Sequence, residues 1–242
     1  MHDSLRSALR AIPGVRSLWH WMVTIHKPAL REELRLLRIG HPRLYQRGGR
    51  TELDRYPRLF AALRDTLAGT TTPSVLSFGC STGEEILSLR SYLPDARLAG
   101  IELNGHRLKT ARRRIADPSV SLWQAGSIAE TGAGDFDAIT CLSVLHRRET
   151  IHNWPADPTP YMSFATFEAA ILDFDAHLRP GGVLLLDHLS FRFADTTVAS
   201  RYRPIQVPNA HADGAPMKRY DRNNQPVLVP PGEHVSLWRK LS

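Results

Sequence analysis

The sequence predicts an α/β fold, a doubly wound and mostly parallel sheet preceded by a helical N-terminal extension. Three observations predict it. From residue 75 onward, short apolar runs alternate with segments whose apolar residues recur every three or four positions. Strands that alternate with helices form right-handed βαβ units, which build a parallel sheet. A turn-rich stretch, residues 69–73, separates this region from an N-terminal part whose apolar spacing is helical.

The strands and helices are expected in alternation along residues 71–242. Short apolar runs predict strands at 75–78, 97–102, 120–123, 136–142 and 183–186, with two more near 227–229 and at 234–241. Helical spacing predicts helices at 84–93, around 108–115 and over 164–178, the last closed by a turn at 179–182. Long loops are expected at 147–163 and 191–226. Ligands of such sheets bind beyond the carboxyl ends of the strands, so the site is expected in the loops after the first four strands.

The N-terminal residues 1–70 are expected to form a helical extension, and residues 71–242 the main domain. Apolar residues at helical spacing predict a first short helix on Leu5, Leu9 and Ile12. The same spacing predicts a second helix around residues 30–37 and a third over residues 53–67. We expect this extension to pack over the ligand end of the sheet as a lid.

The excess positive charge lies in this extension. Residues 1–70 hold 13 Lys and Arg against 6 Asp and Glu, a net charge of +7, whereas residues 71–242 hold 18 of each. This charge is typical of a nucleic-acid contact, or of an anionic-membrane contact through Arg6, Arg10, Arg16, Trp19 and Trp21. It is also typical of a solvated helix face in an arginine-rich chain. We favour the solvated face slightly, because 27 of the 31 basic residues are Arg.

Composition excludes several classes of protein. With 242 residues, 42% of them hydrophobic, the chain is long enough for one sizeable domain plus an appendage. The longest aliphatic run, residues 183–186, is far short of the roughly 20 apolar residues that cross a bilayer, and the N-terminus lacks a signal-peptide core. Two cysteines, Cys80 and Cys141, imply no disulfide framework. We therefore expect a soluble, cytoplasmic protein.

The loop after the first predicted strand carries the strongest motif. Gly79 and Gly83 have only small residues between them, which lets the backbone turn sharply and approach a ligand closely. The next strand ends in Glu102, a position from which a carboxylate can accept both hydroxyls of a ribose. Dinucleotide dehydrogenases and S-adenosylmethionine (SAM) methyltransferases both use this layout. The dehydrogenase pattern G-x-G-x-x-G cannot be placed here, and Glu84 and Glu85 would repel a pyrophosphate but suit the sulfonium and ammonium of SAM.

Residues 53–242 resemble the class I SAM-dependent methyltransferases. The residues that carry the resemblance are Phe78–Glu85, in the G-x-S-x-G-E-E form of the first motif, Phe136–Ile139 followed by Ser143–His146, Leu178–Gly182 and Ser236–Lys240. The resemblance implies a seven-stranded sheet with an antiparallel hairpin at its edge, SAM as the cofactor, and methyl transfer as the reaction.

The resemblance also implies which residues contact SAM. The positions that match the family's cofactor-binding motifs are Gly79, Cys80, Ser81, Gly83, Glu102, Leu103, Asn104, Gly126, Ser127, Ile128, Leu142 and Ser143. The glycine loop would line the methionine part, Glu102 would hold the ribose hydroxyls, and residues 126–128 would meet the adenine. The sequence departs from the pattern at Ser127, where many members of the family have Asp.

Catalytic and substrate-binding residues are expected beyond the fourth and fifth strands. His146, just past the fourth strand, is the candidate general base, since a hydroxyl acceptor benefits from one. The alternative is that His146 only packs beside the cofactor. Asp187 and His188 at the end of the fifth strand, and Tyr161 and Tyr220 in the long loops, are candidate substrate contacts or structural residues.

No metal is expected, and base-amine methylation is not favoured. The end of the fourth strand, residues 140–143, holds no carboxylate of the kind that metal-dependent O-methyltransferases need there. Residues 157–161, Asp-Pro-Thr-Pro-Tyr, resemble the D/N-P-P-Y motif of amine methyltransferases but lie about fifteen residues too far along the chain.

The expected function is SAM-dependent methyl transfer to an acceptor, an oxygen of a small molecule or glycan precursor being favoured. One alternative is an RNA methyltransferase that docks RNA through its basic N-terminus. Another is a non-catalytic module that binds SAM without transferring its methyl group. Peripheral membrane contact is compatible with each of these functions.

Overall fold

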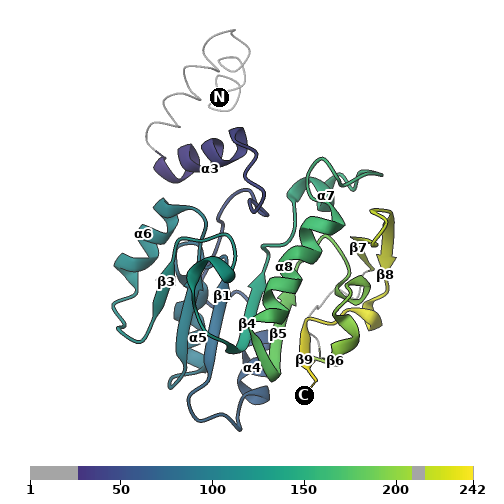
Figure 1. Cartoon of the computed structure of the whole chain (residues 1–242). Coiled ribbons are helices and arrows are strands. Elements are labelled where there is room, and N and C mark those ends of the chain that lie inside the picture. The colour runs from purple at the N-terminus through teal and green to yellow at the C-terminus, as the bar shows by residue number, and fades with distance from the viewer. Residues whose placement is uncertain (1–26, 209–215, 242) are drawn as a thin grey trace, which may run out of the picture.

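The computed structural model describes residues 27–208 and 216–241, and within them a seven-stranded sheet forms the centre of the molecule (Figure 1). Its strand order is β3-β2-β1-β4-β5-β9-β6. The strands are β1 (Ser74–Phe78), β2 (Arg97–Ile101), β3 (Ser121–Trp123), β4 (Phe136–Leu142), β5 (Leu178–Asp187), β6 (Tyr202–Ile205) and β9 (Leu237–Lys240). The first five are parallel to one another, and β9 is antiparallel to both β5 and β6. This sheet confirms the predicted fold class.

Helices lie on both faces of the sheet and at its upper end in Figure 1. They are α3 (Pro28–Arg38), α4 (Pro57–Thr66), α5 (Glu84–Tyr92), α6 (Gly105–Arg114), α7 (Arg148–His152) and α8 (Phe164–Ala176). Short 3-10 turns occur at Ala129–Thr131, Phe193–Asp195, Ala199–Arg201 and Pro231–Glu233. None of the helices within 27–208 and 216–241 combines the length and apolar character that crossing a membrane requires.

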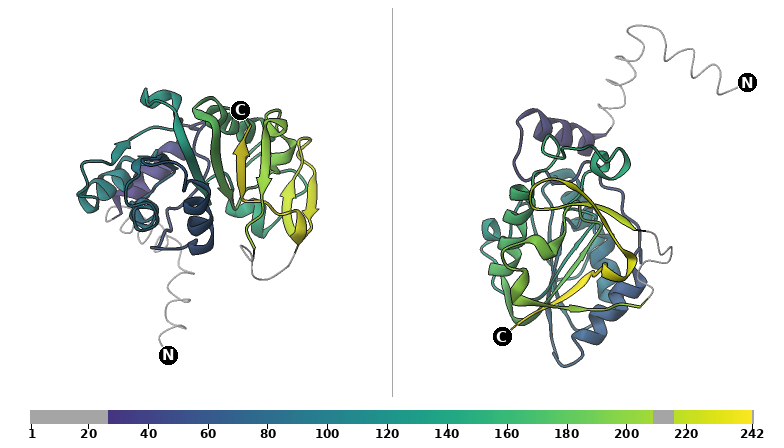
Figure 2. Two further views of the ribbon diagram at one scale, coloured as in Figure 1. Left: turned by 90° about the horizontal axis from the view of Figure 1, so that it is seen from below. Right: turned by 90° about the vertical axis from the view of Figure 1, so that its right-hand side faces the viewer.

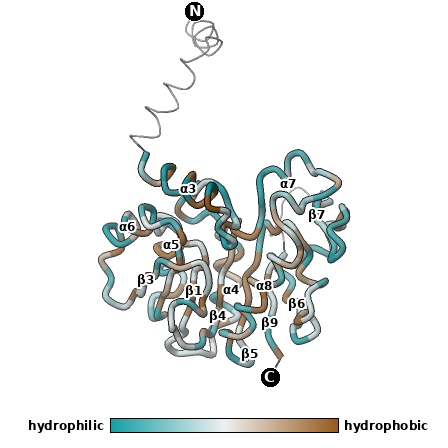
Figure 3. Tube along the Cα trace, turned by 45° about the horizontal axis from the view of Figure 1, so that its top comes forward, coloured by the Kyte–Doolittle hydropathy of each residue, from teal (hydrophilic) through white to brown (hydrophobic). Residues whose placement is uncertain are grey.

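The two faces of the sheet bury two different cores, because side chains alternate along each strand. In β5, Val183 and Leu185 pack with α4, α5 and α6, whereas Leu184 and Leu186 pack with α8. All four are essentially inaccessible to solvent, and burying each such side chain contributes about 1.5–3 kcal/mol. Figure 3 shows hydrophobic segments gathered in the central strands and hydrophilic segments outside them. Both cores brace the strands whose carboxyl ends form the site.

The start of β5 differs from the prediction. The sequence predicts a turn over residues 179–182, but β5 begins at Leu178 and includes it. The pairing with β4 shifts register opposite Asp137, and Gly181 takes a positive φ of 75°. The Arg179 guanidinium donates to Asp137 at 2.8 Å across this irregularity. A bulge therefore accommodates the Pro-Gly-Gly segment without ending the strand.

Three further elements lie where long loops are predicted. They are α7, the edge strand β6, and β7 (Met217–Tyr220), which pairs with β8 (Pro226–Val229) as a separate hairpin. The strand predicted near 227–229 therefore belongs to this hairpin and not to the main sheet. β6 contains Arg203 and Pro204, so it lacks the apolar alternation of a buried strand, and an edge strand tolerates both residues. Figures 1 and 2 place the hairpin at the β6 end of the sheet, opposite α6.

The described part of the N-terminal region packs at the carboxyl ends of the strands. The side-chain amide of Asn104 donates to the carbonyl of Ala29 in α3 at 2.8 Å. The guanidinium of Arg107 in α6 pairs with the carboxylate of Glu33 in α3 at 2.6 Å. The third predicted helix begins at Pro57 rather than residue 53, since proline favours the first helical position. The predicted helix on Leu5, Leu9 and Ile12, and the proposed membrane-contact residues, lie outside the described residues.

Candidate functional site

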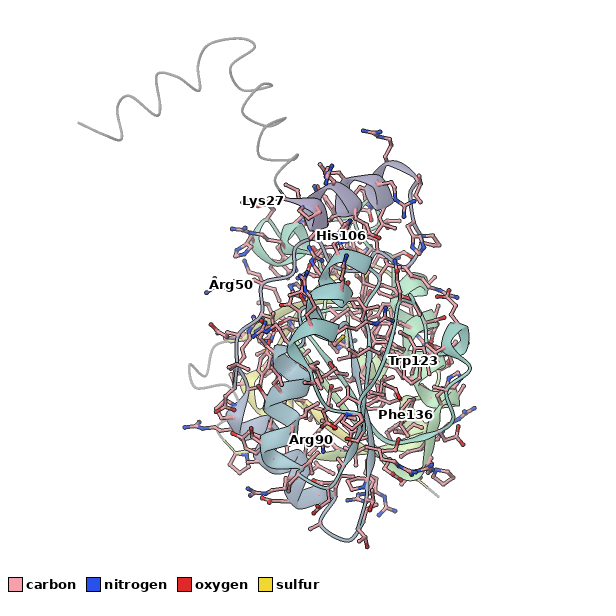
Figure 4. The ribbon with its side chains drawn as sticks, turned by 90° about the vertical axis from the view of Figure 1, so that its left-hand side faces the viewer. Lys27, Arg50, Arg90, His106, Trp123 and Phe136 are labelled. Atoms are coloured by element: carbon pink, nitrogen blue, oxygen red, sulfur yellow. The ribbon has the colours of Figure 1, made fainter. Side chains whose placement is uncertain are left out.

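A cavity of about 390 Å³ lies at the carboxyl ends of β1, β2 and β4, beneath the segment that joins α3 to α4. Figure 4 shows the molecule from its left-hand side, with Lys27 and His106 in the upper part and Phe136, which begins β4, in the lower half. Eleven of the residues singled out by sequence line the cavity: Gly79, Cys80, Ser81, Glu102, Leu103, Asn104, Gly126, Leu142, Ser143, His146 and His188.

The glycine loop forms one wall. Gly79 has a φ of 79°, and a Cβ there would lie only 2.5 Å from Val144, so no other residue fits without displacement. The amides of Gly79 and Cys80 both donate to the carbonyl of Ile101, at 2.8 and 2.9 Å, which ties the loop to β2. The loop therefore presents an open backbone surface to the cavity.

Glu102 stands at the end of β2, buried, and organises the neighbouring backbone. Its Oε2 accepts the amide of Ser81 at 3.0 Å, and its Oε1 accepts the amide of Asn104 at 2.7 Å. Burial raises the pKa of Glu102, while the two backbone amides and Arg107 favour its charged form. A carboxylate has about four acceptor positions, so two hydrogen bonds leave capacity for a ligand's hydroxyls.

A second acid, Glu85, lies on the cavity floor. The carboxylate accepts hydrogen bonds from the hydroxyls of Ser77 at 2.9 Å and Thr140 at 2.5 Å, two fully buried residues. Burial raises the pKa of this carboxyl. Within residues 27–208 and 216–241 Glu85 forms no ion pair, although buried carboxylates are ordinarily paired. The floor therefore suits a ligand that carries a positive charge.

The third loop holds fewer of the predicted contacts. Gly126 lines the cavity, but Ser127 accepts a hydrogen bond from Arg43 at 2.6 Å and does not line it. Ile128 is fully buried, and Gly83 packs against α6 as the residue that precedes α5. Gly83, Ser127 and Ile128 are thus placed around the cavity rather than on its surface.

The opposite wall is formed where β4 and β5 end. Ser143 and His188 follow these strands with φ values of 59° and 50°, a conformation that residues other than glycine rarely adopt. The Ser143 amide donates to the carbonyl of Asp187 at 3.0 Å, and its hydroxyl lies 2.7 Å from the hydroxyl of Tyr56. The Tyr56 and His188 rings are 5.8 Å apart. Backbone strain at two adjacent strand ends is typical of functional sites.

Asp187 lies behind His188 and does not reach the cavity. It is 1% exposed, and its Oδ2 lies 3.1 Å from Nδ1 of His188. Its Oδ1 lies 3.3 Å from Nε2 of His234 and 3.4 Å from the hydroxyl of Ser236. The carboxylate is therefore fixed from two sides, and it orients the His188 ring so that Nε2 is the nitrogen on the far side from Asp187.

His146 lies on the same wall in a different electrostatic environment. Burial lowers its pKa to about 4, and the positive charges of Arg219 and Arg55 act in the same direction. Its Nε2 lies 3.0 Å from the side-chain nitrogen of Gln46. His146 is therefore uncharged near neutral pH and binds a proton weakly.

Residues 76–184 match the family model described as a methyltransferase domain. The matched segment covers 109 of the 242 residues. It runs from β1 into β5 and so includes the glycine loop, Glu102 and Ser143. The strand order of the sheet, with its antiparallel β9, is that of the class I methyltransferases. No curated protein sequence matches the chain.

Several solved methyltransferase structures are similar in fold. One is the N-methyltransferase NodS from Bradyrhizobium japonicum WM9 in complex with S-adenosyl-L-homocysteine (SAH), with 17% identity, a TM-score of 0.49, and coverage of 78% of this chain and 87% of that one. Another is the plantazolicin methyltransferase BpumL with SAH, with 12% identity, a TM-score of 0.39, and coverage of 73% and 54%. The chain spans about half the length of BpumL.

Two predicted substrate contacts lie outside the cavity. Tyr220 is fully buried, its hydroxyl donates to the carbonyl of Pro155 at 2.8 Å, and its ring packs against Phe191. Tyr161 borders a separate hollow of about 270 Å³ beside Leu36 and Tyr45. The prediction for Tyr220 is wrong, because burial in the core keeps it from any ligand, and Tyr161 lies in a different hollow.

The cavity is also lined by residues that the sequence did not single out. Residues 43–56 line a large part of the cavity, among them Gln46, Gly49 and Tyr56. The carbonyl of Gly49 accepts the hydroxyl of Ser81 at 3.2 Å, which places this segment directly over the glycine loop. No motif marks it, because its role depends on the tertiary fold. Within 27–208 and 216–241, no three His, Cys, Asp or Glu side chains are grouped to hold a metal.

Proposed function

We propose that the protein transfers a methyl group from SAM to an acceptor, with an oxygen of a small molecule or glycan precursor favoured. The observation that carries the proposal is a cavity on a methyltransferase domain that contains two acids, Glu102 and Glu85, at its cofactor end. Neither acid is neutralised by an ion pair with a residue of the described chain.

The residues at this end fit SAM. Glu102 has acceptor capacity for the two ribose hydroxyls, and Glu85 suits the methionine ammonium. The open backbone of Gly79 admits close approach of a ligand, while Glu84 and Glu85 at the start of α5 disfavour a phosphate there. When bound, SAM supplies an electrophilic methyl carbon. Positioning of the acceptor then contributes much of the rate.

The opposite wall supplies the proton acceptor. His188 lines the cavity and has Asp187 3.1 Å behind its Nδ1, so a proton taken at Nε2 is stabilised by a buried carboxylate. His146 has no carboxylate within ion-pair distance in the described chain, and its pKa is lowered to about 4. We therefore assign the general-base role to His188, and a positioning role to His146.

The N-terminal extension, residues 1–70, covers the cofactor end as a lid in this proposal. Two contacts support it, the hydrogen bond from Ser81 to Gly49 and the one from Asn104 to Ala29. We call the wall formed by the glycine loop and residues 102–104 the cofactor wall. Both contacts join a residue of this wall to a residue of the extension. Cofactor exchange then requires residues 43–56 to move away from the glycine loop.

Titration calorimetry with SAM and SAH tests the proposed function. Micromolar binding of both is expected, with binding much weaker in Glu102→Ala and unchanged in Glu52→Ala, an exposed acid at the edge of the same cavity. Absence of SAM and SAH binding, or equal loss in both variants, would contradict the proposal. NAD in the same experiment is expected not to bind.

A further inference from the structure

The cavity is lined by basic residues as well as by Glu85 and Glu102. Arg55 precedes Tyr56, and Arg148 and His152 lie on α7; all three are exposed and line the cavity. These three residues are called the basic rim. Figure 1 shows α7 and α3 at the same end of the sheet, and Figure 3 colours α7 as hydrophilic. We call the wall formed by Tyr56, Ser143 and His188 the acceptor wall. The rim therefore lies on the solvent side of this wall.

The arginines of the rim differ from Arg43, Arg47 and Arg107, three other arginines of the cavity, in forming no ion pair with a carboxylate of the described residues. Arg107 pairs with Glu33, and Arg43 pairs with Glu130. Arg148 forms no hydrogen bond or ion pair with any residue in 27–208 or 216–241. Arg55 reaches only the carbonyl of Arg50, at 3.4 Å, and lies over the Tyr56 ring at 5.1 Å. Their guanidinium donors remain available to a ligand.

The acids near the rim do not cancel its charge. Glu149 of α7 is engaged by Arg47 at 3.4 Å, and Glu52 is exposed at the cavity edge. Positive charge also reaches deeper into the acceptor wall, because Arg55 and the buried Arg219 both act to lower the pKa of His146. The charge of Arg55 also favours the charged form of Glu85, and Asp187 acts on Arg219, so this positive charge lies beside both acids.

We propose that the basic rim, Arg55, Arg148 and His152, binds a carboxylate or phosphate group of the methyl acceptor. The inference rests on the proposed function, because it assigns the opposite wall to the cofactor. Arg55 is adjacent in sequence to Tyr56, and Tyr56 contacts both Ser143 and His188. The rim therefore adjoins the residues proposed to face the reacting atoms. An anion held at the rim would leave an acceptor's hydroxyl on the Tyr56 and His188 side of the cavity. The acceptor class is thus a small molecule that carries both an anionic group and a nucleophilic atom.

The test is a chemical-shift titration of the SAH-saturated protein with inorganic phosphate, and separately with acetate, at constant ionic strength set by chloride. Saturable shifts confined to the basic rim are expected, and about tenfold weaker binding in Arg55→Gln and in Arg148→Gln. The matched control is Arg113→Gln, an exposed arginine of α6 outside the cavity, for which unchanged binding is expected. Saturation by both anions indicates either group on the acceptor, and saturation by phosphate alone indicates a phosphate.

Two results would overturn the inference. Equal phosphate binding in the wild type and in both rim variants would show that the rim is not the site. Phosphate binding to the SAH-free protein that disappears when SAH is added to saturation would show that the arginines serve the cofactor's own carboxylate. Failure of SAH to bind would instead contradict the proposed function, and the phosphate titration of the protein alone would still report on the rim.

Discussion

The two walls of the cavity are built in different ways. The cofactor wall consists of loops that each follow one strand, and its key residues Gly79 and Glu102 lie within 23 positions of each other in the sequence. The acceptor wall joins Tyr56, Ser143 and His188, which are far apart in the sequence and meet only in the fold. The first wall is therefore encoded by a local sequence motif, and the second is formed by tertiary packing. Substitutions on the first wall are expected to lower cofactor affinity. Substitutions on the second are expected to lower the turnover rate and leave cofactor affinity unchanged.

The largest effect is expected from Glu102→Gln on the cofactor wall. The substitution removes the charge that accepts the amides of Ser81 and Asn104, and with it the best acceptor for ribose hydroxyls. SAH affinity is expected to fall on the order of 100-fold, equivalent to about 2.7 kcal/mol. Calorimetry measures this, with Glu52→Gln as the control. An affinity within twofold of wild type would remove Glu102 from the cofactor site.

On the acceptor wall, His188→Gln is expected to lower the methyl-transfer rate about 100-fold and leave SAH affinity within twofold. His146→Gln is expected to lower the rate less than tenfold. Because burial lowers the pKa of His146 to about 4, this residue stays uncharged between pH 5 and 8 and contributes no inflection to the rate profile there. The rate of SAH formation by both variants is measured at several pH values in a discontinuous assay. A larger loss in His146→Gln than in His188→Gln would reverse the assignment.

Glu85→Gln is expected to raise the stability of the cofactor-free protein at pH 8 by about 1 kcal/mol, and less at pH 5. Burial raises the pKa of Glu85, so the folded state binds this proton more tightly than the unfolded state does. Wild-type stability therefore falls as pH rises from 4.5 through the folded-state pKa, and the variant lacks this fall. Urea unfolding at both pH values measures the difference. The same variant is expected to bind SAH more weakly, and a pH-independent difference would argue against a buried charge.

Tyr56→Phe is expected to have a smaller effect that sharpens the comparison within the acceptor wall. It removes the hydroxyl 2.7 Å from that of Ser143 and retains the ring beside His188. The expected cost is about 1 kcal/mol of unfolding free energy, with SAH affinity unchanged. Thermal unfolding with and without SAH measures both quantities. A large loss of SAH affinity would place Tyr56 on the cofactor wall instead.

The smallest effect on activity is expected from Tyr220→Phe. The hydroxyl of Tyr220 donates to the carbonyl of Pro155, and neither residue lines the cavity. Unfolding free energy is expected to fall by about 1 kcal/mol, while the KM for the acceptor stays the same. An increase in KM without loss of stability would restore Tyr220 as a substrate contact.

Most of the fold was predictable, and the exceptions have physical causes. The strand at 136–142 was predicted at the bounds that the structure has, because five of its seven residues are apolar, as is typical of a buried central strand. β6 and β7 were missed, since Arg203, Pro204 and Lys218 interrupt any apolar alternation. Ile128 and Ser127 were placed at the adenine by analogy with a motif, but Arg43 engages Ser127 and core packing encloses Ile128.

The sequence by itself determined the order of strands and helices, the glycine loop and the acid that follows it. These features depend on spacing within a few residues and on backbone freedom at single positions such as Gly79. Only the tertiary structure decided which histidine has a carboxylate behind it, which arginines lack partners, and that Tyr56 completes the acceptor wall. The contact between Tyr56 and Ser143 joins residues 87 positions apart, and the orientation of neighbouring side chains such as Asp187 and His188 depends on packing, so no local pattern records either.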